Sequence, residues 1–166
     1  DAALTTVDVG VETREGRVVL RGMAPDSAAR DRATQLATAV KGVVGNCYLN
    51  SGQTCTAHTR MLVPAARYAE AAQIAVEVAQ AYRPGDPMTE GTTLGPLASK
   101  MQQDRVRDYI AKGIAEGCEL LAGGVALPDG LPAGGYYVAP TVFGRVDPRA
   151  TIAQEEIFGP VLSIIS

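Results

Sequence analysis

The feature of the sequence that most constrains its fold is an apolar run at residues 161–165, which reads Val-Leu-Ser-Ile-Ile. A continuous apolar run of this kind is typical of a strand in a parallel sheet, because helices bury such a sheet on both faces. Apolar side chains recur at helical spacing in two earlier segments, one after Pro64 and one after Ser99. The pattern predicts an α/β fold. Further short strands are expected at residues 61–63, 118–122 and 141–143.

The two helices expected between these strands have start and stop signals. The first follows Pro64 and ends at the cluster of Pro and Gly residues at 83–87. The second begins at Ser99, which makes a capping-box pattern with Gln102, and it ends at Gly117. The buried stripe of the first helix is predicted to be Tyr68, Ala71, Ala72, Ala75, Val78, Ala79 and Tyr82. The second helix is predicted to turn Val106, Tyr109, Ile110 and Ile114 inward.

The sequence pattern of residues 1–43 differs from that of the rest of the chain and predicts a β-β-α segment. An alternating run at residues 7–13 and a second run at residues 17–21 flank a Glu-Gly turn, which indicates a hairpin. A helix-start signal follows at residues 25–27, and Gly42 is expected to end that helix. One face of the helix carries Ala29, Ala33, Leu36, Ala37 and Val40.

Composition narrows the class of protein. Apolar residues make up 46% of the 166-residue chain and charged residues 20%, which is ordinary for a soluble protein. A net charge of -3 argues against nucleic acid as the partner, and no apolar run is long enough to span a membrane. The odd number of cysteines, 3, fits reduced thiols, so we expect a cytoplasmic location. Their spacing matches no zinc template, and no metal site is expected.

A polar loop at residues 50–55 carries the strongest chemical signal of the sequence. It contains Gly52, ends on Cys55 and leads into an apolar strand. A cysteine reacts as the thiolate, and backbone N–H groups in a tight loop stabilise that anion and the oxyanion formed when sulfur attacks a carbonyl. The alternative is a buried, inert cysteine beside a turn, because free cysteine is among the most buried residue types. Local chemistry alone favours this alternative.

The motif Asn50-x-Gly52-Gln53-x-Cys55 resembles the nucleophile motif of the aldehyde dehydrogenase superfamily. The second signature of that family is similar to residues 155–161, which read Glu-Glu-Ile-Phe-Gly-Pro-Val. Between them, three shorter motifs fall in the order of the family's catalytic domain, at residues 95–97, 135–137 and 140–143. The resemblance covers about residues 44–166 and implies a truncated aldehyde dehydrogenase-like catalytic domain, preceded by the short β-β-α segment.

The resemblance also implies roles for individual residues. Cys55 would attack a small-molecule aldehyde, and its own backbone N–H would hold the resulting oxyanion. Glu156 would bind the ribose hydroxyls next to the nicotinamide of NAD or NADP, and Phe158 would lie beside the nicotinamide. The aldehyde would leave as a carboxylic acid, by way of a thiohemiacetal and a thioester on Cys55. No strand followed by Gly-x-Gly-x-x-Gly and a helix occurs in the sequence, so we expect little or no dehydrogenase activity from this chain alone.

Residues 1–43 resemble part of a BON domain, a small module of bacterial envelope and osmotic-stress proteins, most clearly over residues 11–43. The sequence thus predicts two units, 1–43 and 44–166, joined near residues 41–45. A second hypothesis follows, in which the protein is a non-enzymatic fusion whose BON-like segment binds a partner or a membrane surface. A dinucleotide-binding domain in the parent reading frame would favour the enzyme. We also expect a homo-oligomer, or self-association through exposed apolar surface.

Overall fold

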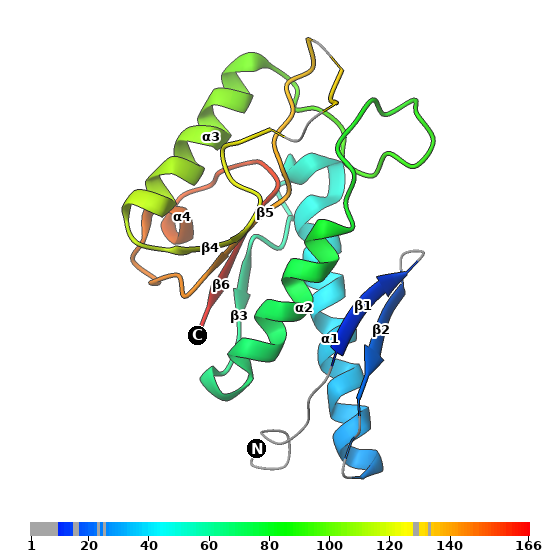
Figure 1. Ribbon diagram of the computed structural model, residues 1–166. Helices are drawn as coiled ribbons and strands as arrows, with labels where there is room; N and C mark the ends of the chain where they lie inside the picture. The colour runs from blue at the N-terminus through cyan, green and yellow to red at the C-terminus, as the bar shows by residue number, and fades with distance from the viewer. Residues whose placement is uncertain (1–9, 15–16, 23, 25, 128–129, 133) are drawn as a thin grey trace.

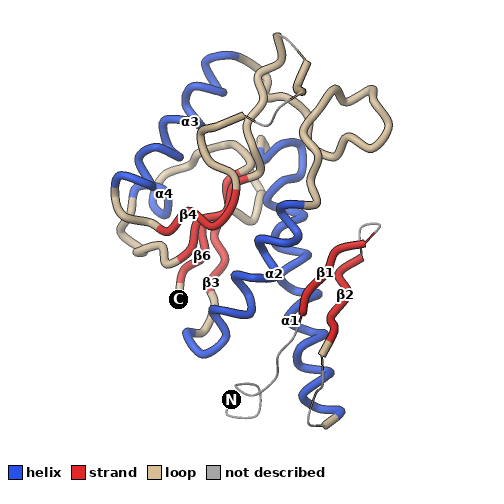
Figure 2. Tube along the Cα trace, viewed as in Figure 1, coloured by secondary structure: helices blue, strands red, loops and turns tan. Residues whose placement is uncertain are grey.

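A computed structural model of the chain describes residues 10–166 apart from 15–16, 23, 25, 128–129 and 133 (Figure 1). The described residues form a four-stranded sheet with helices on both faces and a separate two-stranded hairpin, as Figure 2 shows by colour. The fold is therefore α/β, as the apolar runs predicted. The strands are β1 Gly10–Arg14, β2 Arg17–Arg21, β3 Arg60–Leu62, β4 Glu119–Ala122, β5 Thr141–Gly144 and β6 Val161–Ile165. The α-helices are α1 Ser27–Tyr48, α2 Tyr68–Gln80, α3 Lys100–Ala115 and α4 Thr151–Gln154.

The apolar run at residues 161–165 forms β6, which lies inside the sheet. The strand order is β3-β6-β5-β4, and β6 is parallel to both of its neighbours. The edge strand β4 is antiparallel to β5. Side chains alternate between the two faces of a strand, so Leu162 and Ile164 join one core cluster and Val161 joins the other. The expectation of a buried parallel strand is confirmed.

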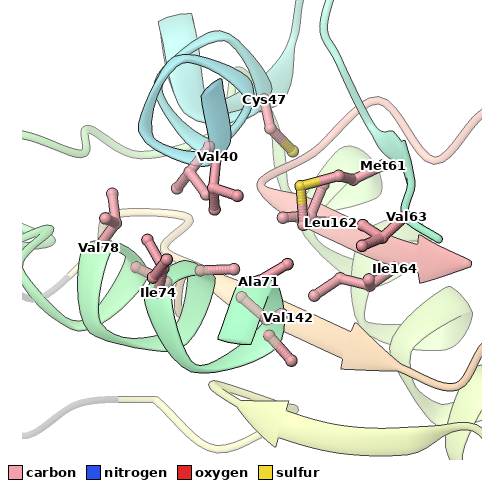
Figure 3. Close-up of a cluster of buried hydrophobic side chains, with 14 of the residues drawn as sticks. Val40, Cys47, Met61, Val63, Ala71, Ile74, Val78, Val142, Leu162 and Ile164 are labelled. Carbon is pink, nitrogen blue, oxygen red and sulfur yellow. The ribbon is translucent and has the colours of Figure 1, made fainter. Parts of the chain in front are cut away.

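The first core cluster fills the space between the sheet and the helices α1 and α2 (Figure 3). Figure 3 shows Val78 of α2 beside Val40 of α1, and Ala71 of α2 beside Val142 of β5. Burying an aliphatic side chain of this size contributes roughly 1.5–3 kcal/mol relative to leaving it exposed. The predicted stripe of α2 is confirmed: Tyr68, Ala71, Ala72, Ala75, Val78 and Ala79 are buried and Tyr82 is partly buried.

The second core cluster lies on the opposite face, under α3 and α4, and it corrects one predicted contact. Val106 and Ile110 are buried as expected, but Ile114 is 43% exposed. The inward position of the last turn of α3 is Gly113, where an added Cβ would lie 3.1 Å from the ring of Phe143. The helix approaches the sheet closely at this glycine, and the neighbouring isoleucine therefore turns outward.

Helix α3 ends where its sequence predicted. Gly117 has a φ of +84°, the left-handed conformation that glycine adopts without a steric penalty. Its N–H donates to Ile114 O, and the N–H of Cys118 donates to Gly113 O. These two bonds make a Schellman motif, which satisfies carbonyl groups that the helix would otherwise leave without partners.

Helix α1 continues beyond the predicted stop at Gly42. Asp26 caps its N-terminus by accepting a hydrogen bond from the N–H of Ala29 at 2.7 Å, but the helix runs on to Tyr48. Glycine lowers helix stability by about 1 kcal/mol relative to alanine. Burial of Val44, Cys47 and Tyr48 in the next turns outweighs this cost. The Gly42 prediction was wrong for this reason, and the expected join near residues 41–45 lies within a continuous helix.

The predicted hairpin is present in the described residues. Strands β1 and β2 are antiparallel, with Gly10 opposite Arg21 and Arg14 opposite Arg17. The expected strand residues 7–9 and the Glu-Gly turn at 15–16 lie outside the described residues. The hairpin lies against α1 and α2 (Figure 1), and Leu20 packs onto the first core cluster. The β-β-α segment therefore shares a hydrophobic core with the rest of the chain. None of the helices in the described segments has the length and apolar character needed to cross a bilayer.

Candidate active site

The loop that precedes Cys55 has an unusual backbone. Asn50, Ser51 and Gly52 have φ values of +52°, +57° and +74°, so three consecutive residues are left-handed. This conformation costs roughly 1–2 kcal/mol for each residue other than glycine. Such backbone persists only where the surrounding structure enforces it, and it occurs preferentially at functional sites. The observed strain therefore marks this loop as a candidate site.

Two hydrogen bonds and one close backbone contact hold the loop. The Ser51 hydroxyl donates to Gly95 O at 2.9 Å, and the Gln53 side-chain oxygen accepts from the N–H of Ala98 at 2.9 Å. Gly52 lies against Gly159 so closely that an added Cβ would be 2.1 Å from the Gly159 carbonyl oxygen. The nucleophile motif is thus fastened to two of the other motifs that the sequence singled out.

The three thiols of the chain differ in exposure. Cys55 is exposed, whereas Cys47 and Cys118 are buried. Burial raises the pKa of the Cys47 thiol to about 12 and also raises the pKa of Cys118. Both buried thiols therefore remain protonated at neutral pH and are not reactive. Cys55 is therefore not the buried cysteine of the alternative interpretation, and its reactivity stays a prediction.

The second motif forms the loop between α4 and β6. Glu156 is exposed, Ile157 is buried in the second core cluster, and Phe158 is half-buried with a left-handed φ of +60°. The Gln102 side-chain amide donates to the carbonyls of Ile157 and Phe158, at 3.2 and 2.8 Å. Ser99 caps α3 as predicted, accepting from the N–H of Gln102 at 3.2 Å. The Gln102 side chain, however, holds this loop and does not complete a capping box.

The five sequence motifs meet at one end of the sheet. This is the end at which the parallel strands β3, β5 and β6 have their N-termini. Leu97 N–H donates to Tyr136 O, and Thr141 N–H donates to Pro160 O, both at 2.9 Å. The buried Gln103 amide donates to Tyr137 O at 2.8 Å. These backbone and amide contacts join segments that are far apart in sequence.

Sequence reasoning missed the residues that fasten the motifs together. Ser51 and Gln103 carried no signal of their own, Gln53 was identified only as a position of the nucleophile motif, and Gln102 was assigned only to a helix cap. Their importance depends on tertiary contacts, which local patterns do not encode. A polar residue on the apolar stripe of α3, as at Gln103, was the one available hint, because buried polar groups need partners.

Other candidate chemistry is weak. His58 is exposed and lies outside the contacts that hold the loop. Among the described residues, no group of three or more His, Cys, Asp and Glu side chains is placed to hold a metal ion.

Comparison with known families agrees with this geometry. The sequence matches the model of the aldehyde dehydrogenase family over residues 27–166 and that of the BON domain over residues 1–45. The two matches overlap over residues 27–45, which lie within α1. The aldehyde dehydrogenase match thus begins earlier than the motifs alone indicated, and the shared helix explains why no break separates the two segments.

Individual relatives cover most of this chain. It is 48% identical over 130 residues to 3-succinoylsemialdehyde-pyridine dehydrogenase from a Pseudomonas species, a match that covers 78% of this chain and 27% of that protein. Aldehyde dehydrogenase C from Pseudomonas syringae, solved as a variant with NAD+ and octanal, gives a TM-score of 0.76 at 44% identity, over 79% of this chain and 27% of that one. A Mycobacterium tuberculosis aldehyde dehydrogenase complexed with NAD+ gives a TM-score of 0.75 at 45% identity, over 78% and 26%.

The chain spans about 27% of the length of the relatives that it matches. Within that span, the family match covers the strained loop, the exposed thiol and the segment that Gly159 brings against them. The chain belongs to the aldehyde dehydrogenase family.

Proposed function

We propose that this chain supplies the cysteine nucleophile and the nicotinamide-side residues of an NAD(P)+-dependent aldehyde dehydrogenase. The observation that carries the proposal is the strained turn at residues 50–52, which leads to the exposed Cys55 and is seated on Gly159 of the Glu156 segment. The two solved structures described above support it, since both are aldehyde dehydrogenases complexed with NAD+.

Cys55 has the role of the nucleophile in this proposal. Its thiolate attacks the aldehyde carbon, a C–S bond forms, and the carbonyl oxygen becomes an oxyanion. The backbone N–H of Cys55 donates to that oxygen, and the thiohemiacetal results. When bound, NAD(P)+ would supply the acceptor for the hydride that the former aldehyde carbon loses. Cys55 then holds the acyl group as a thioester until water releases the carboxylic acid and restores the thiol.

The residues present fit the nicotinamide ribose end of the cofactor. The Glu156 carboxylate is exposed and has no hydrogen bond or ion pair to another described residue, whereas Tyr109 donates to the carboxylate of the adjacent Glu155 at 2.6 Å. A carboxylate without protein partners is suited to accept two ribose hydroxyls. Phe158 would lie beside the nicotinamide. We assign no residue of this chain to the pyrophosphate, because the sequence lacks a Gly-x-Gly-x-x-Gly pattern.

Thiol reactivity and ester hydrolysis test the role of Cys55. Brief treatment of the folded chain with iodoacetamide should label Cys55 before the other two thiols, as peptide mapping would show. Hydrolysis of p-nitrophenyl acetate should be slow, and Cys55→Ala should abolish it while Cys118→Ala preserves it. Faster labelling of Cys47 or Cys118, or ester hydrolysis that survives Cys55→Ala, would contradict the proposal.

The 166-residue chain alone should form negligible NADH from an aliphatic or an aromatic aldehyde. Positioning the reacting groups supplies roughly 7–11 kcal/mol of a typical barrier, and Glu156 with Phe158 would contact only one end of the dinucleotide. Absorbance at the NADH band measures this directly. Rapid NADH formation that Cys55→Ala removes would show that this chain positions the cofactor by itself.

A further inference from the structure

We propose that Arg105 and Tyr109 are positioning residues, which hold the loop of Glu156 so that this carboxylate and not that of Glu155 faces the ligand. The inference deepens the proposed function and rests on the role assigned there to Glu156. It concerns the contacts that α3 makes with the second motif, residues 155–161. The sequence pattern predicted only a packing role for this helix.

The contacts form a row along one face of α3. Arg105 donates to the Glu156 carbonyl at 2.6 Å, and the Tyr109 hydroxyl donates to the Glu155 carboxylate at 2.6 Å. Gln102 adds its two bonds to the carbonyls of Ile157 and Phe158. Positions 102, 105 and 109 are three or four residues apart, so their side chains lie on one face of the helix. Four consecutive residues of the loop, 155–158, are each held from this face.

The loop needs such contacts because its backbone is strained. Phe158 is left-handed with a φ of +60°, and non-glycine residues keep this conformation only where surrounding contacts enforce it. Helix α4, which leads into the loop, has only one turn and offers little restraint. The side chains of α3 therefore have to fix the direction of the segment that carries Glu156.

The two adjacent glutamates are chemically identical, so their surroundings must distinguish them. Tyr109 is buried and directs its hydroxyl at Glu155. The guanidinium of Arg105 lies 4.9 Å from the centre of the Tyr109 ring, and the ammonium of Lys112 lies 5.0 Å from it. These cations hold the ring in place by cation–π attraction. Glu155 is thereby occupied within the protein, and Glu156 remains available.

The composition of the chain provides a clean readout, because it contains only 2 phenylalanines. Phe158 lies in the loop, and Phe143 is fully buried in the second core cluster. Labelling with 4-fluorophenylalanine should give two ¹⁹F NMR resonances, one that reports on the loop and one that serves as an internal control for the core.

The test compares Glu155→Ala with Glu155→Gln in the labelled full chain. Glu155→Ala removes the acceptor of the Tyr109 hydrogen bond, so the Phe158 resonance should shift or broaden while the Phe143 resonance stays in place. Glu155→Gln keeps an acceptor and should restore the parent spectrum. Arg105→Gln should also move the Phe158 resonance alone. A matched surface control, Glu90→Ala, should change neither resonance.

Two results would overturn the inference. Unchanged spectra in Glu155→Ala and Arg105→Gln would show that the contacts do not hold the loop, and equal movement of both resonances would assign them to overall folding. Failure of the proposed function is distinguished by the alkylation and ester hydrolysis of Cys55, which do not depend on the contacts between α3 and the loop. A parent Phe158 resonance that responds to NAD+ while the Phe143 resonance stays in place would support the cofactor role of Glu156.

Discussion

Gly52 and Gly159 are in direct backbone contact. A Cβ placed on Gly52 would lie 2.1 Å from the carbonyl oxygen of Gly159 and 2.6 Å from the nitrogen of Pro160. Gly52 also has a φ of +74°, so both its conformation and its surroundings require glycine. This contact joins the loop of the nucleophile to the loop of Glu156, and it makes the relative position of the two motifs a property of the backbone.

We expect Gly52→Ala to destabilise the chain and to separate the two loops. The left-handed backbone alone costs an alanine about 1–2 kcal/mol, and the overlap with backbone atoms adds to this because a carbonyl group cannot rotate away. Urea unfolding measures the loss of stability, and the rate of Cys55 alkylation reports the change in the loop. A variant as stable as the parent, with unchanged alkylation, would contradict the contact.

Gly42 is the opposite case and shows where sequence reasoning failed. The residue is exposed within α1, and an added Cβ would meet no atom within 4 Å. Glycine is a common stop signal, so a local pattern ends the helix there. The packing of later turns against the sheet keeps the chain helical, and that packing depends on residues more than one hundred positions away, such as Leu162.

We therefore expect Gly42→Ala to stabilise the chain by about 0.5–1 kcal/mol, because alanine loses less backbone entropy in a helix. It is the matched control for Gly52→Ala, since both changes add one methyl group to a glycine. Urea unfolding of the two variants side by side measures the difference. A loss of stability in Gly42→Ala would show that α1 is not helical at this position.

The sequence motifs indicated which residues could carry the chemistry of the candidate site. They did not indicate which residues hold the site in place. The roles that the motifs assign to Cys55 and Glu156 stay predictions, whereas the periodicity of α3 correctly predicted that Tyr109 faces inward. Which of two adjacent glutamates is occupied by the protein could not be read from the sequence, because the answer lies in a hydroxyl of another element. Gln102 was likewise assigned to the nearest local pattern, whereas its side chain bonds to carbonyls 55 and 56 residues further along the chain.

The buried Cys47 thiol should make stability depend on pH. Its pKa is raised to about 12 by burial, from an ordinary value near 9.0, so above pH 9 the unfolded chain releases a proton that the folded chain keeps. The free energy of unfolding should then fall as pH rises, by up to about 1.4 kcal/mol per pH unit. Urea unfolding between about pH 8 and pH 10 measures the slope. Tyrosines, whose ordinary pKa lies at about 10, begin to ionise in this range, so the contribution of Cys47 is taken from the difference between the parent and a variant that lacks the thiol.

Cys47→Ala is the control for this pH dependence. The substitution lowers stability by a constant amount through lost packing, but it should make the slope shallower by the contribution of one proton. Cys118, whose pKa is also raised by burial, contributes equally to both proteins. Equal slopes in the parent and in Cys47→Ala would show that the thiol is not shielded from water.

The outer edge of β3 should make this chain self-associate. β3 is the last strand of the sheet, and no other described strand pairs with its free side. Leu62 on this strand is 77% exposed, next to backbone groups that are free to pair with another strand.

We expect Leu62→Lys to weaken association roughly ten-fold or more, since burying a leucine contributes about 1.5–3 kcal/mol. Met88→Lys is the matched control, because Met88 is 91% exposed but lies in the loop at residues 84–97. Sedimentation velocity at several concentrations measures the effect, and a parent chain that stays monomeric throughout would refute the prediction.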